Sequence, residues 1–477
     1  MTSYARIGLF AIAMAPACDF GPPYCEGEWA TVSQEQEPSM TQARVVAQVL
    51  AAESSAVDML FVIDDSRSMM DEQEQLGIWS SELFDVLSAS GELPDLHIGV
   101  VSSTVAIDTA DATFPGCESG GTLHVGGAVL QRGRFIRDVA GPAGRERNYS
   151  GTLTETFAKM ALVGDGGCGF EQPFKAARLV LSGNGAGSQD FLRDDALLLV
   201  VFVTDEDDCS ARSSTLFTDP YADACSELGA ITSYRCFEHG VRCYDGKGSR
   251  AFGERRNCRP DESSPYVESV SDFADFLKGR KRNPAQVVVA GIYGKPNMVT
   301  AIPDERITTY STPRLANVCG DGGKEGSGAT PAIRMNALMA EFGGRASQSS
   351  ICESELSWAM RDVGLVTRGA ATRSHCLRGA LIDIDAAAGG IQPACRVEVA
   401  SDVGTPLETR IELPPCDRAE GKRCFTLDID AGCADTETQL AFGVDGRADN
   451  ETLTVACDVD VDAPPHQPWN GKTDTSK

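Results

Sequence analysis

Long apolar runs alternate with amphipathic segments along the chain up to about Cys376. Four of these runs predict buried strands, because strands covered on both faces carry few polar positions; they lie at residues 57–64, 95–103, 196–208 and 286–294. Apolar residues spaced three and four positions apart predict helices at residues 71–90, 149–163, 170–184, 267–281, 335–344 and 351–366. Strands that alternate with helices predict an α/β domain with a doubly wound, mostly parallel sheet and helices on both faces.

After Cys376 the pattern changes to short segments of alternating polarity, separated by turn residues. Such segments predict a small all-β domain. Its density of cysteines predicts disulfides that stabilise it; these cysteines are Cys376, Cys395, Cys416, Cys424, Cys433 and Cys457. The expected organisation is a signal peptide at 1–17, a polar tether at 18–55, the sheet domain at 56–368 with a cysteine-rich insertion at about 207–262, the β domain at 376–460 and a disordered tail at 461–477.

The N-terminus has the features of an export signal. Arg6 precedes an apolar stretch, and the small residues of "APAC" follow it. Cleavage after Ala17 would give a secreted protein, whereas the segment also resembles bacterial lipoproteins, in which Cys18 would carry a lipid. The chain has 17 cysteines. Lipid attachment at Cys18 would leave an even number that can pair completely, as expected in an oxidising compartment.

The net charge limits the range of partners. A formal charge of −27 argues against nucleic acid and against simple docking on anionic lipid, because both attract basic surfaces. It fits an exported protein or one that binds cations. We therefore expect a protein of the bacterial cell envelope or surface, or else a secreted one, with membrane contact only through a lipid on Cys18.

Acidic and hydroxyl side chains follow two of the predicted strands. Asp64, Ser66 and Ser68 follow the first strand, and Asp205 follows the third. The carboxyl ends of parallel strands share one edge of a sheet, where ligands bind. Carboxylate and hydroxyl oxygens suit Mg²⁺ or Ca²⁺. The alternative is that Asp64 and Ser66 only cap the following helix and that Asp205 begins a solvated acidic turn.

The stretch "DDSRSM" resembles the Asp-x-Ser-x-Ser signature of von Willebrand factor A (VWA) domains, and the later strand ends in "TD" as in that family. The resemblance implies a VWA-like fold over residues 56–368 and a metal-ion-dependent adhesion site (MIDAS). Its metal ligands would be Asp64, Ser66, Ser68 and Asp205. The family usually adds a Thr just before a helix. Here Glu171 stands at about that place, which would add charge to the site and favour Ca²⁺.

Two other chemistries are disfavoured. Cys236, His239 and Cys243 have a spacing that suits zinc, but disulfides are the expected state of cysteines outside the cytosol. The chain has 5 histidines, and none accompanies a G-x-S-x-G motif, so we do not expect an enzyme.

The expected function is that of an exported, surface-anchored binding module. A divalent cation in the MIDAS-type site would bind a Glu or Asp carboxylate of a partner protein or peptide. Two alternatives stay open. The protein could be a structural envelope protein in which the metal only stabilises the fold, or, less favoured, a secreted hydrolase.

Overall fold

The computed structural model describes most of the expected sheet domain and parts of the β domain, at residues 44–50, 56–89, 91–109, 114, 116–118, 120–219, 221–222, 226–306, 312–320, 328–371, 375–376, 394–401, 408–416, 423–429, 440–444 and 451–458. The expected signal peptide, Cys18 and the expected tail at 461–477 lie outside these residues. Within the described ranges, no helix combines the length and the apolar character needed to span a membrane.

A seven-stranded sheet forms the centre of the molecule, in the order β13-β10-β6-β2-β3-β4-β5. The strands from β13 to β3 run parallel, and β4 and β5 are antiparallel additions at one edge. The bounds are β2 Ala56–Ile63, β3 Asp95–Ser102, β4 Ile136–Gly141, β5 Gly144–Arg147, β6 Leu197–Val203, β10 Val287–Tyr293 and β13 Ala346–Ser350. The predicted mostly parallel sheet is therefore confirmed.

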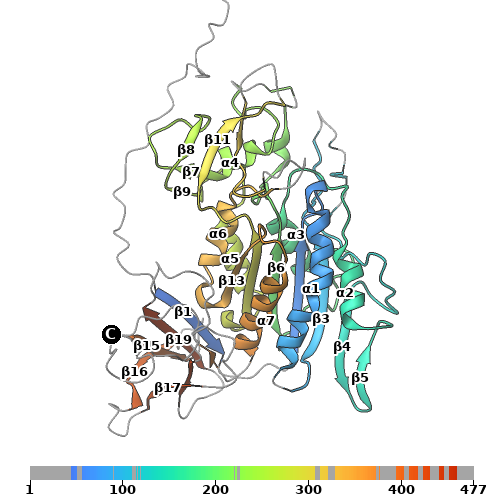
Figure 1. The fold of residues 1–477 in the computed structure, drawn as a ribbon, viewed down its shortest axis with the longest axis vertical. Helices are drawn as coiled ribbons and strands as arrows, with labels where there is room; N and C mark the ends of the chain where they lie inside the picture. The colour runs from blue at the N-terminus through green and yellow to red at the C-terminus, as the bar shows by residue number, and fades with distance from the viewer. Residues whose placement is uncertain are drawn as a thin grey trace, which may run out of the picture.

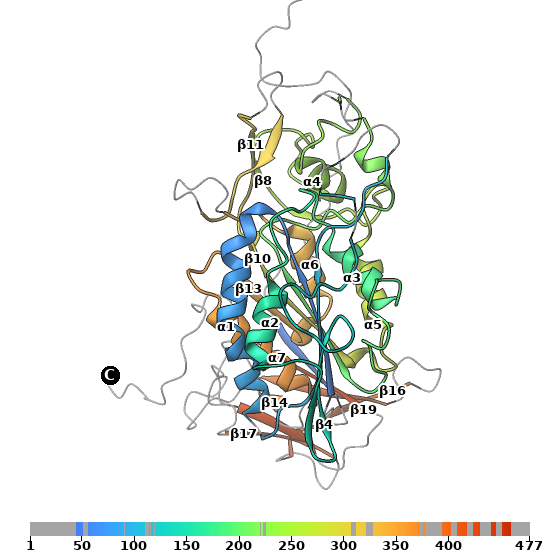
Figure 2. The same ribbon diagram turned by 90° about the vertical axis from the view of Figure 1, so that its right-hand side faces the viewer.

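Helices cover both faces of this sheet (Figures 1 and 2). On one face lie α1 (Met70–Ser88), α2 (Leu153–Ala161) and α7 (Ser357–Ala371); on the other lie α3 (Pro173–Leu181), α5 (Val270–Lys278) and α6 (Ile333–Ala340). Along β2, Met59 and Phe61 pack toward the first group, and Leu60 and Val62 toward the second. Burial on both faces explains the nearly continuous apolar run of this strand.

Much of the predicted cysteine-rich insertion forms a cap at one end of the sheet domain, at the top of Figures 1 and 2. The cap contains η2 (Ser214–Phe217), α4 (Tyr234–Gly240), β7 (Val241–Cys243), β8 (Gly253–Arg255) and β9 (Cys258–Pro260). Later strands complete it, because β11 (Val299–Pro303) pairs with both β8 and β12 (Pro313–Leu315). The remaining short 3-10 helices are η1 Arg67–Met69, η3 Pro284–Gln286 and η4 Gly343–Arg345.

The C-terminal strands lie at the opposite end of the sheet domain from the cap (Figure 1). They form a four-stranded sheet, β1-β19-β15-β16, and a three-stranded sheet, β14-β18-β17. Their bounds are β1 Arg44–Leu50, β14 His375–Cys376, β15 Cys395–Ser401, β16 Thr409–Leu413, β17 Phe425–Ile429, β18 Leu440–Val444 and β19 Glu451–Asp458.

Strand β1 departs from the expected organisation. Residues 44–50 fall in the predicted tether at 18–55, yet they form β1 and pair with β19 along its length. The sheet domain is therefore inserted between the first strand of the C-terminal sheet and the other strands. No signal in 18–55 alone indicated this, because the partner strand lies about 400 residues later in the chain.

A buried group of charges joins three segments near the amino ends of the parallel strands. The Asp58 carboxylate, which is fully buried, accepts hydrogen bonds from Arg193 Nε at 2.8 Å and from Lys281 Nζ at 3.3 Å. The ring of His97 lies 3.7 Å from the same carboxylate. A buried ion pair contributes little net stability, but removing one partner leaves an uncompensated charge in the interior.

We predict that Asp58→Asn lowers the free energy of unfolding by about 3 kcal/mol, because Arg193 and Lys281 lose their buried counter-ion. The control is Asp194→Asn, which makes the same charge change at a side chain that is 92% exposed and 4.0 Å from Arg282. Urea unfolding followed by tryptophan fluorescence measures both. An unchanged midpoint for Asp58→Asn would contradict the prediction.

Candidate metal centre

The loop after β2 holds Asp64 in a fixed orientation. One carboxylate oxygen, Oδ1, accepts a hydrogen bond from the Ser66 backbone N–H at 2.7 Å, and Oδ2 accepts one from the Thr204 hydroxyl at 2.7 Å. The Gln73 side chain donates to the Asp64 carbonyl at 2.9 Å and so fastens the loop to α1. Thr204 was not predicted as a site residue. Its signal was the "TD" at the end of the third predicted strand.

The structure brings both serines and the second predicted aspartate to the same place. The hydroxyl oxygens of Ser66 and Ser68 lie 3.0 Å apart. The Ser68 hydroxyl is close enough to the Asp205 carboxylate to lower its pKa by hydrogen bonding. Strands β2 and β6 are neighbours in the sheet, so the loops that follow them meet at its carboxyl edge. Asp64, Ser66, Ser68 and Asp205 thus form one group of oxygens.

Without a bound cation, the burial of these acidic side chains is electrostatically unfavourable. Asp64 is fully buried and Asp205 is 6% exposed. Burial raises the pKa of Asp64 to about 7. Burial raises the pKa of Asp205 well above its ordinary value, and the nearby negative charges of Asp64, Glu206 and Glu72 raise it further. Glu72, in the first turn of α1, was not predicted to belong to this site.

Asp205 also has an unused acceptor. Its Oδ1 atom is buried and has no hydrogen-bond partner among the described residues. A buried polar atom without a partner is destabilising, more so when the group is charged. A divalent cation beside Asp205 would neutralise the carboxylates and use this oxygen as a ligand. The residues present therefore fit a hard cation held by two carboxylates and two hydroxyls.

Glu171 lies nearby but has a different environment. It is 4% exposed, and its pKa is raised well above the ordinary value by burial and then by the charges of Glu206 and Asp64. Its side chain is hydrogen-bonded to that of Glu206. The part of the chain that the structure describes contains no group of three or more His, Cys, Asp or Glu side chains arranged to hold a metal. The role of Glu171 as a metal ligand stays a prediction.

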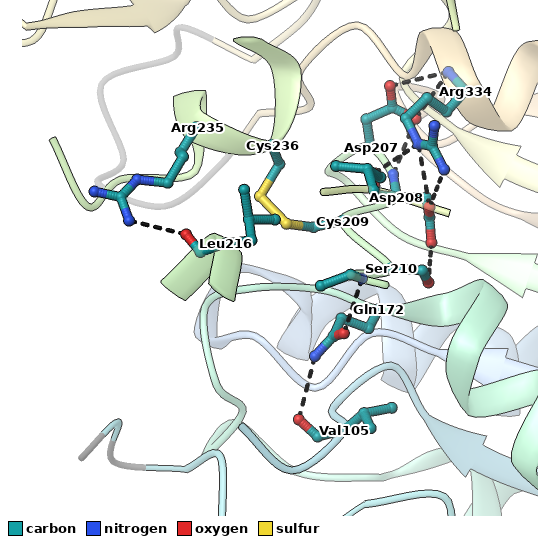
Figure 3. Close-up of a disulfide and its surroundings, with 12 residues drawn as sticks. Val105, Gln172, Asp207, Asp208, Cys209, Ser210, Leu216, Arg235, Cys236 and Arg334 are labelled. Atoms are coloured by element: carbon teal, nitrogen blue, oxygen red, sulfur yellow. Dashed lines mark hydrogen bonds and ion pairs between the residues drawn. A yellow bond between two sulfur atoms is a disulfide. The ribbon is translucent and has the colours of Figure 1, made fainter. Parts of the chain in front are cut away.

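The acids that follow Asp205 have other partners. Asp207 accepts hydrogen bonds from the backbone N–H groups of Arg334 and Met335, at 2.9 and 3.1 Å, and so caps the N-terminus of α6. Asp208 forms a buried ion pair with Arg334, at 2.9 Å between Oδ2 and Nη2 (Figure 3). These contacts leave Asp207 and Asp208 to orient the loop that carries Asp205.

A disulfide anchors the same loop to the cap. Cys209 is bonded to Cys236 on α4 (Figure 3). Cys243 is bonded to Cys258, and the His239 ring lies 3.2 Å from a backbone carbonyl oxygen. The alternative zinc site at Cys236, His239 and Cys243 is therefore wrong, because both thiols are consumed in disulfides.

A second disulfide fixes the loop that precedes Glu171. Cys117 is bonded to Cys168, and the Thr104 hydroxyl contacts both the Cys168 backbone N–H and the Asp65 carboxylate, at 3.2 and 2.8 Å. The Gly167 backbone N–H donates to the Asp65 carbonyl at 2.8 Å, and a Cβ on Gly167 would lie 2.6 Å from that oxygen. Three loops around the predicted ligands are thus tied to one another.

Comparisons with known proteins give only distant likenesses. No protein-family model and no curated protein matches the chain. Among solved structures it is similar to the pilus adhesin SpaC of Lactobacillus rhamnosus GG, with a TM-score of 0.29 and 9% identity over 87% of this chain and 41% of the adhesin. It is also similar to a von Willebrand factor type A protein of Catenulispora acidiphila, with a TM-score of 0.26 and 9% identity over 89% of this chain and 67% of that one.

A third solved structure, the proximal thread matrix protein 1 of the mussel byssus, has a TM-score of 0.28 and 10% identity over 70% of this chain and 51% of its own. The chain thus spans less than half of the adhesin and about half of the byssus protein. At these TM-scores the likenesses assign no family and carry no inference about function.

We predict that Cys209→Ser combined with Cys236→Ser weakens Mg²⁺ or Ca²⁺ binding by about tenfold, because the Asp205 loop loses its anchor. The matched control is the pair Cys395→Ser and Cys457→Ser, which removes a disulfide in the C-terminal sheet. Isothermal titration calorimetry measures the cation affinity of each. Equal losses in both double variants, or no loss in the first, would contradict this role of the disulfide.

Proposed function

We propose that this chain is an exported binding module with a VWA-like sheet domain, which binds a carboxylate of a partner protein through a divalent cation. The cation would be held by Asp64, Ser66, Ser68 and Asp205. When bound, it supplies an electrophilic centre with a free coordination position for an oxygen of the partner. We propose further that the protein is not an enzyme.

The single observation that carries this proposal is the buried, unpartnered Oδ1 atom of Asp205. It belongs to a carboxylate that shares its surroundings with Asp64 and Ser68. Helix capping alone, the alternative left open by the sequence, does not account for it. In the described structure the Asp64 carboxylate accepts from Ser66 N–H, but no side-chain cap bond is made at the start of η1 or α1. A cation explains why two acids are buried together.

The order of the elements supports a VWA-like domain. The Asp-x-Ser-x-Ser motif lies between β2 and α1, and Asp205 follows the neighbouring parallel strand β6. Export is supported by the six disulfides among the described residues, since disulfides persist mainly outside the reducing cytosol. A lipid on Cys18 would anchor the module to a bacterial membrane, and that part of the proposal rests on the sequence.

Three histidine rings give no support to a hydrolase. The rings of His97, His124 and His239 each lie within hydrogen-bond distance of a backbone carbonyl, at 2.8, 3.1 and 3.2 Å. Burial lowers the pKa of each ring. They thus act as buried or half-buried structural groups, and none is hydrogen-bonded to Ser66 in the described residues.

A second candidate function is a purely structural cation. The observation that favours it is the extra negative charge of Glu171 and Glu206 beside the site, which would reduce the attraction of the cation for a partner's acid. In this case the cation would stabilise the protein without taking part in binding.

The test is a capture experiment with surface extracts from the source cells, using the immobilised full chain. We predict that the wild type captures specific partners in Mg²⁺ and loses them in EDTA. Asp205→Asn should abolish both this capture and the Mg²⁺ binding that calorimetry detects, because it removes a charged ligand with little change of volume. Asp85→Asn, an exposed acid on α1, is the matched control and should behave as the wild type.

The two candidate functions give different results. If Asp205→Asn loses the cation but captures the same partners, the structural role is correct and the binding role is wrong. If calorimetry detects no binding of Mg²⁺ or Ca²⁺ by the wild type, or the same binding by Asp205→Asn, the proposed site does not exist.

A further inference from the structure

Part of the candidate metal centre lines a pocket at the carboxyl edge of the sheet. The pocket has a volume of about 650 Å³, and Ser68 and Asp205 belong to its lining. Other parts of the lining come from the cap, namely Tyr234 and Phe237 of α4 and the segment around Leu315 of β12. Figures 1 and 2 both place α4 and β11 at the end of the sheet domain where this pocket lies.

The size of the pocket limits what can reach the cation. Pockets of about 300–1,000 Å³ hold small molecules, whereas a typical protein–protein interface covers about 800 Å² on each partner. A broad, flat protein surface cannot approach Asp205 while α4 and β12 stand beside it. A side chain or a chain end on an extended segment can. The pocket thus fits a narrow group of a partner.

Several charged groups around the pocket are already paired within the chain. Asp207 and Asp208 contact Arg334 and the N-terminus of α6. Asp304 accepts two hydrogen bonds from the Arg306 guanidinium, at 2.9 and 2.8 Å. These carboxylates therefore have few hydrogen-bonding positions left for a ligand.

Arg314 differs from the other charged groups of the lining. Its Nη1 atom donates to the Leu315 carbonyl at 3.3 Å, and no ion pair of its guanidinium within 4.0 Å is found among the described residues, although its positive charge helps to lower the pKa of Asp304. The strand that carries it is rigidly placed, because Arg314 and Leu315 pair with Ile302 and Ala301 of β11. The backbone of Arg314 is therefore held in place beside the pocket, and its half-buried, positively charged side chain belongs to the lining.

We propose that the pocket receives a single carboxylate on an extended peptide segment of the partner, with Arg314 as its second charged contact. The carboxylate would reach the cation, and the flanking peptide would pack against Tyr234 and Phe237. This inference rests on the proposed function. It specifies that the ligand is a narrow acidic segment, and it names Arg314 as the residue that selects for the negative charge of that segment.

The charges of the pocket explain why both contacts are needed. Asp205, Glu171 and Glu206 line the pocket and repel an acidic ligand. The cation offsets part of this charge, and Arg314 can form a charge-assisted hydrogen bond with the carboxylate. Peptide binding should therefore require the cation and depend strongly on Arg314.

The test uses the full chain and fluorescein-labelled hexapeptide pools, with binding measured by fluorescence polarisation in MgCl₂. One pool has a fixed internal Asp and an amidated end, a second has Asn at that position, and a third has a free C-terminal carboxylate without an internal acid. We expect binding of the first or third pool and not of the second, which distinguishes a side-chain carboxylate from a terminal one. Arg314→Gln should weaken binding at least about tenfold.

Two controls separate the outcomes. Arg256→Gln makes the same charge change at an exposed cap residue that pairs with Glu254, and it should leave peptide binding unchanged. Calorimetric titration with Mg²⁺ should give the same cation affinity for wild type and Arg314→Gln, which also shows that the variant is folded.

Equal peptide affinity of wild type and Arg314→Gln would overturn the inference, and so would binding of the Asn pool as strong as that of both pools that carry a carboxylate. Absence of peptide binding by a protein that does bind Mg²⁺ would overturn it as well and leave the proposed cation site standing. If the wild type binds no cation at all, the proposed function itself fails.

Discussion

The structure depends on the burial of two carboxylates side by side at the carboxyl edge of a parallel sheet. Asp64 is fully buried and Asp205 nearly so, and burial raises the pKa of both carboxyl groups; the charge of Asp64 raises the pKa of Asp205 further. The hydrogen bonds from Ser66 N–H and Thr204 offset part of this unfavourable charge at Asp64. No such donor reaches Oδ1 of Asp205 within the described residues. The divalent cation that we propose would satisfy this arrangement.

The rest of the fold holds the two acids together. Adjacent parallel strands set their separation, and Gln73 and Thr204 hold the first loop. The second loop is held by a helix N-terminus, by the buried ion pair between Asp208 and Arg334, and by a disulfide to the cap. The same cap then encloses the site. The disulfide to the cap therefore has two effects. It helps to hold the Asp205 loop in place, and it keeps the cap beside the candidate site, which makes the site narrow.

Much of this could be predicted from the sequence, because the signals were local. The apolar runs predict strands β2 and β6, and the Asp-x-Ser-x-Ser spacing identifies the acidic and hydroxyl side chains after the first of them. The structure brings Asp64, Ser66, Ser68 and Asp205 together. The pairing of β1 with β19 could not be predicted, since strand partners are set by contacts between distant segments. Short, polar strands such as β5 and β13 lack the apolar pattern that marks a buried strand. The surroundings of Glu171 depend on Glu206 across two loops, which no spacing reveals.

The most direct measurement is the anomalous scattering of crystals grown with MnCl₂, an ion that takes the same oxygen ligands as Mg²⁺. We predict one strong peak, about 2.0–2.2 Å from the hydroxyl oxygens of Ser66 and Ser68 and in contact, directly or through water, with Asp64 and Asp205. At least one coordination position should face the pocket. Crystals that hold Mn²⁺ elsewhere but none beside these four side chains would contradict it.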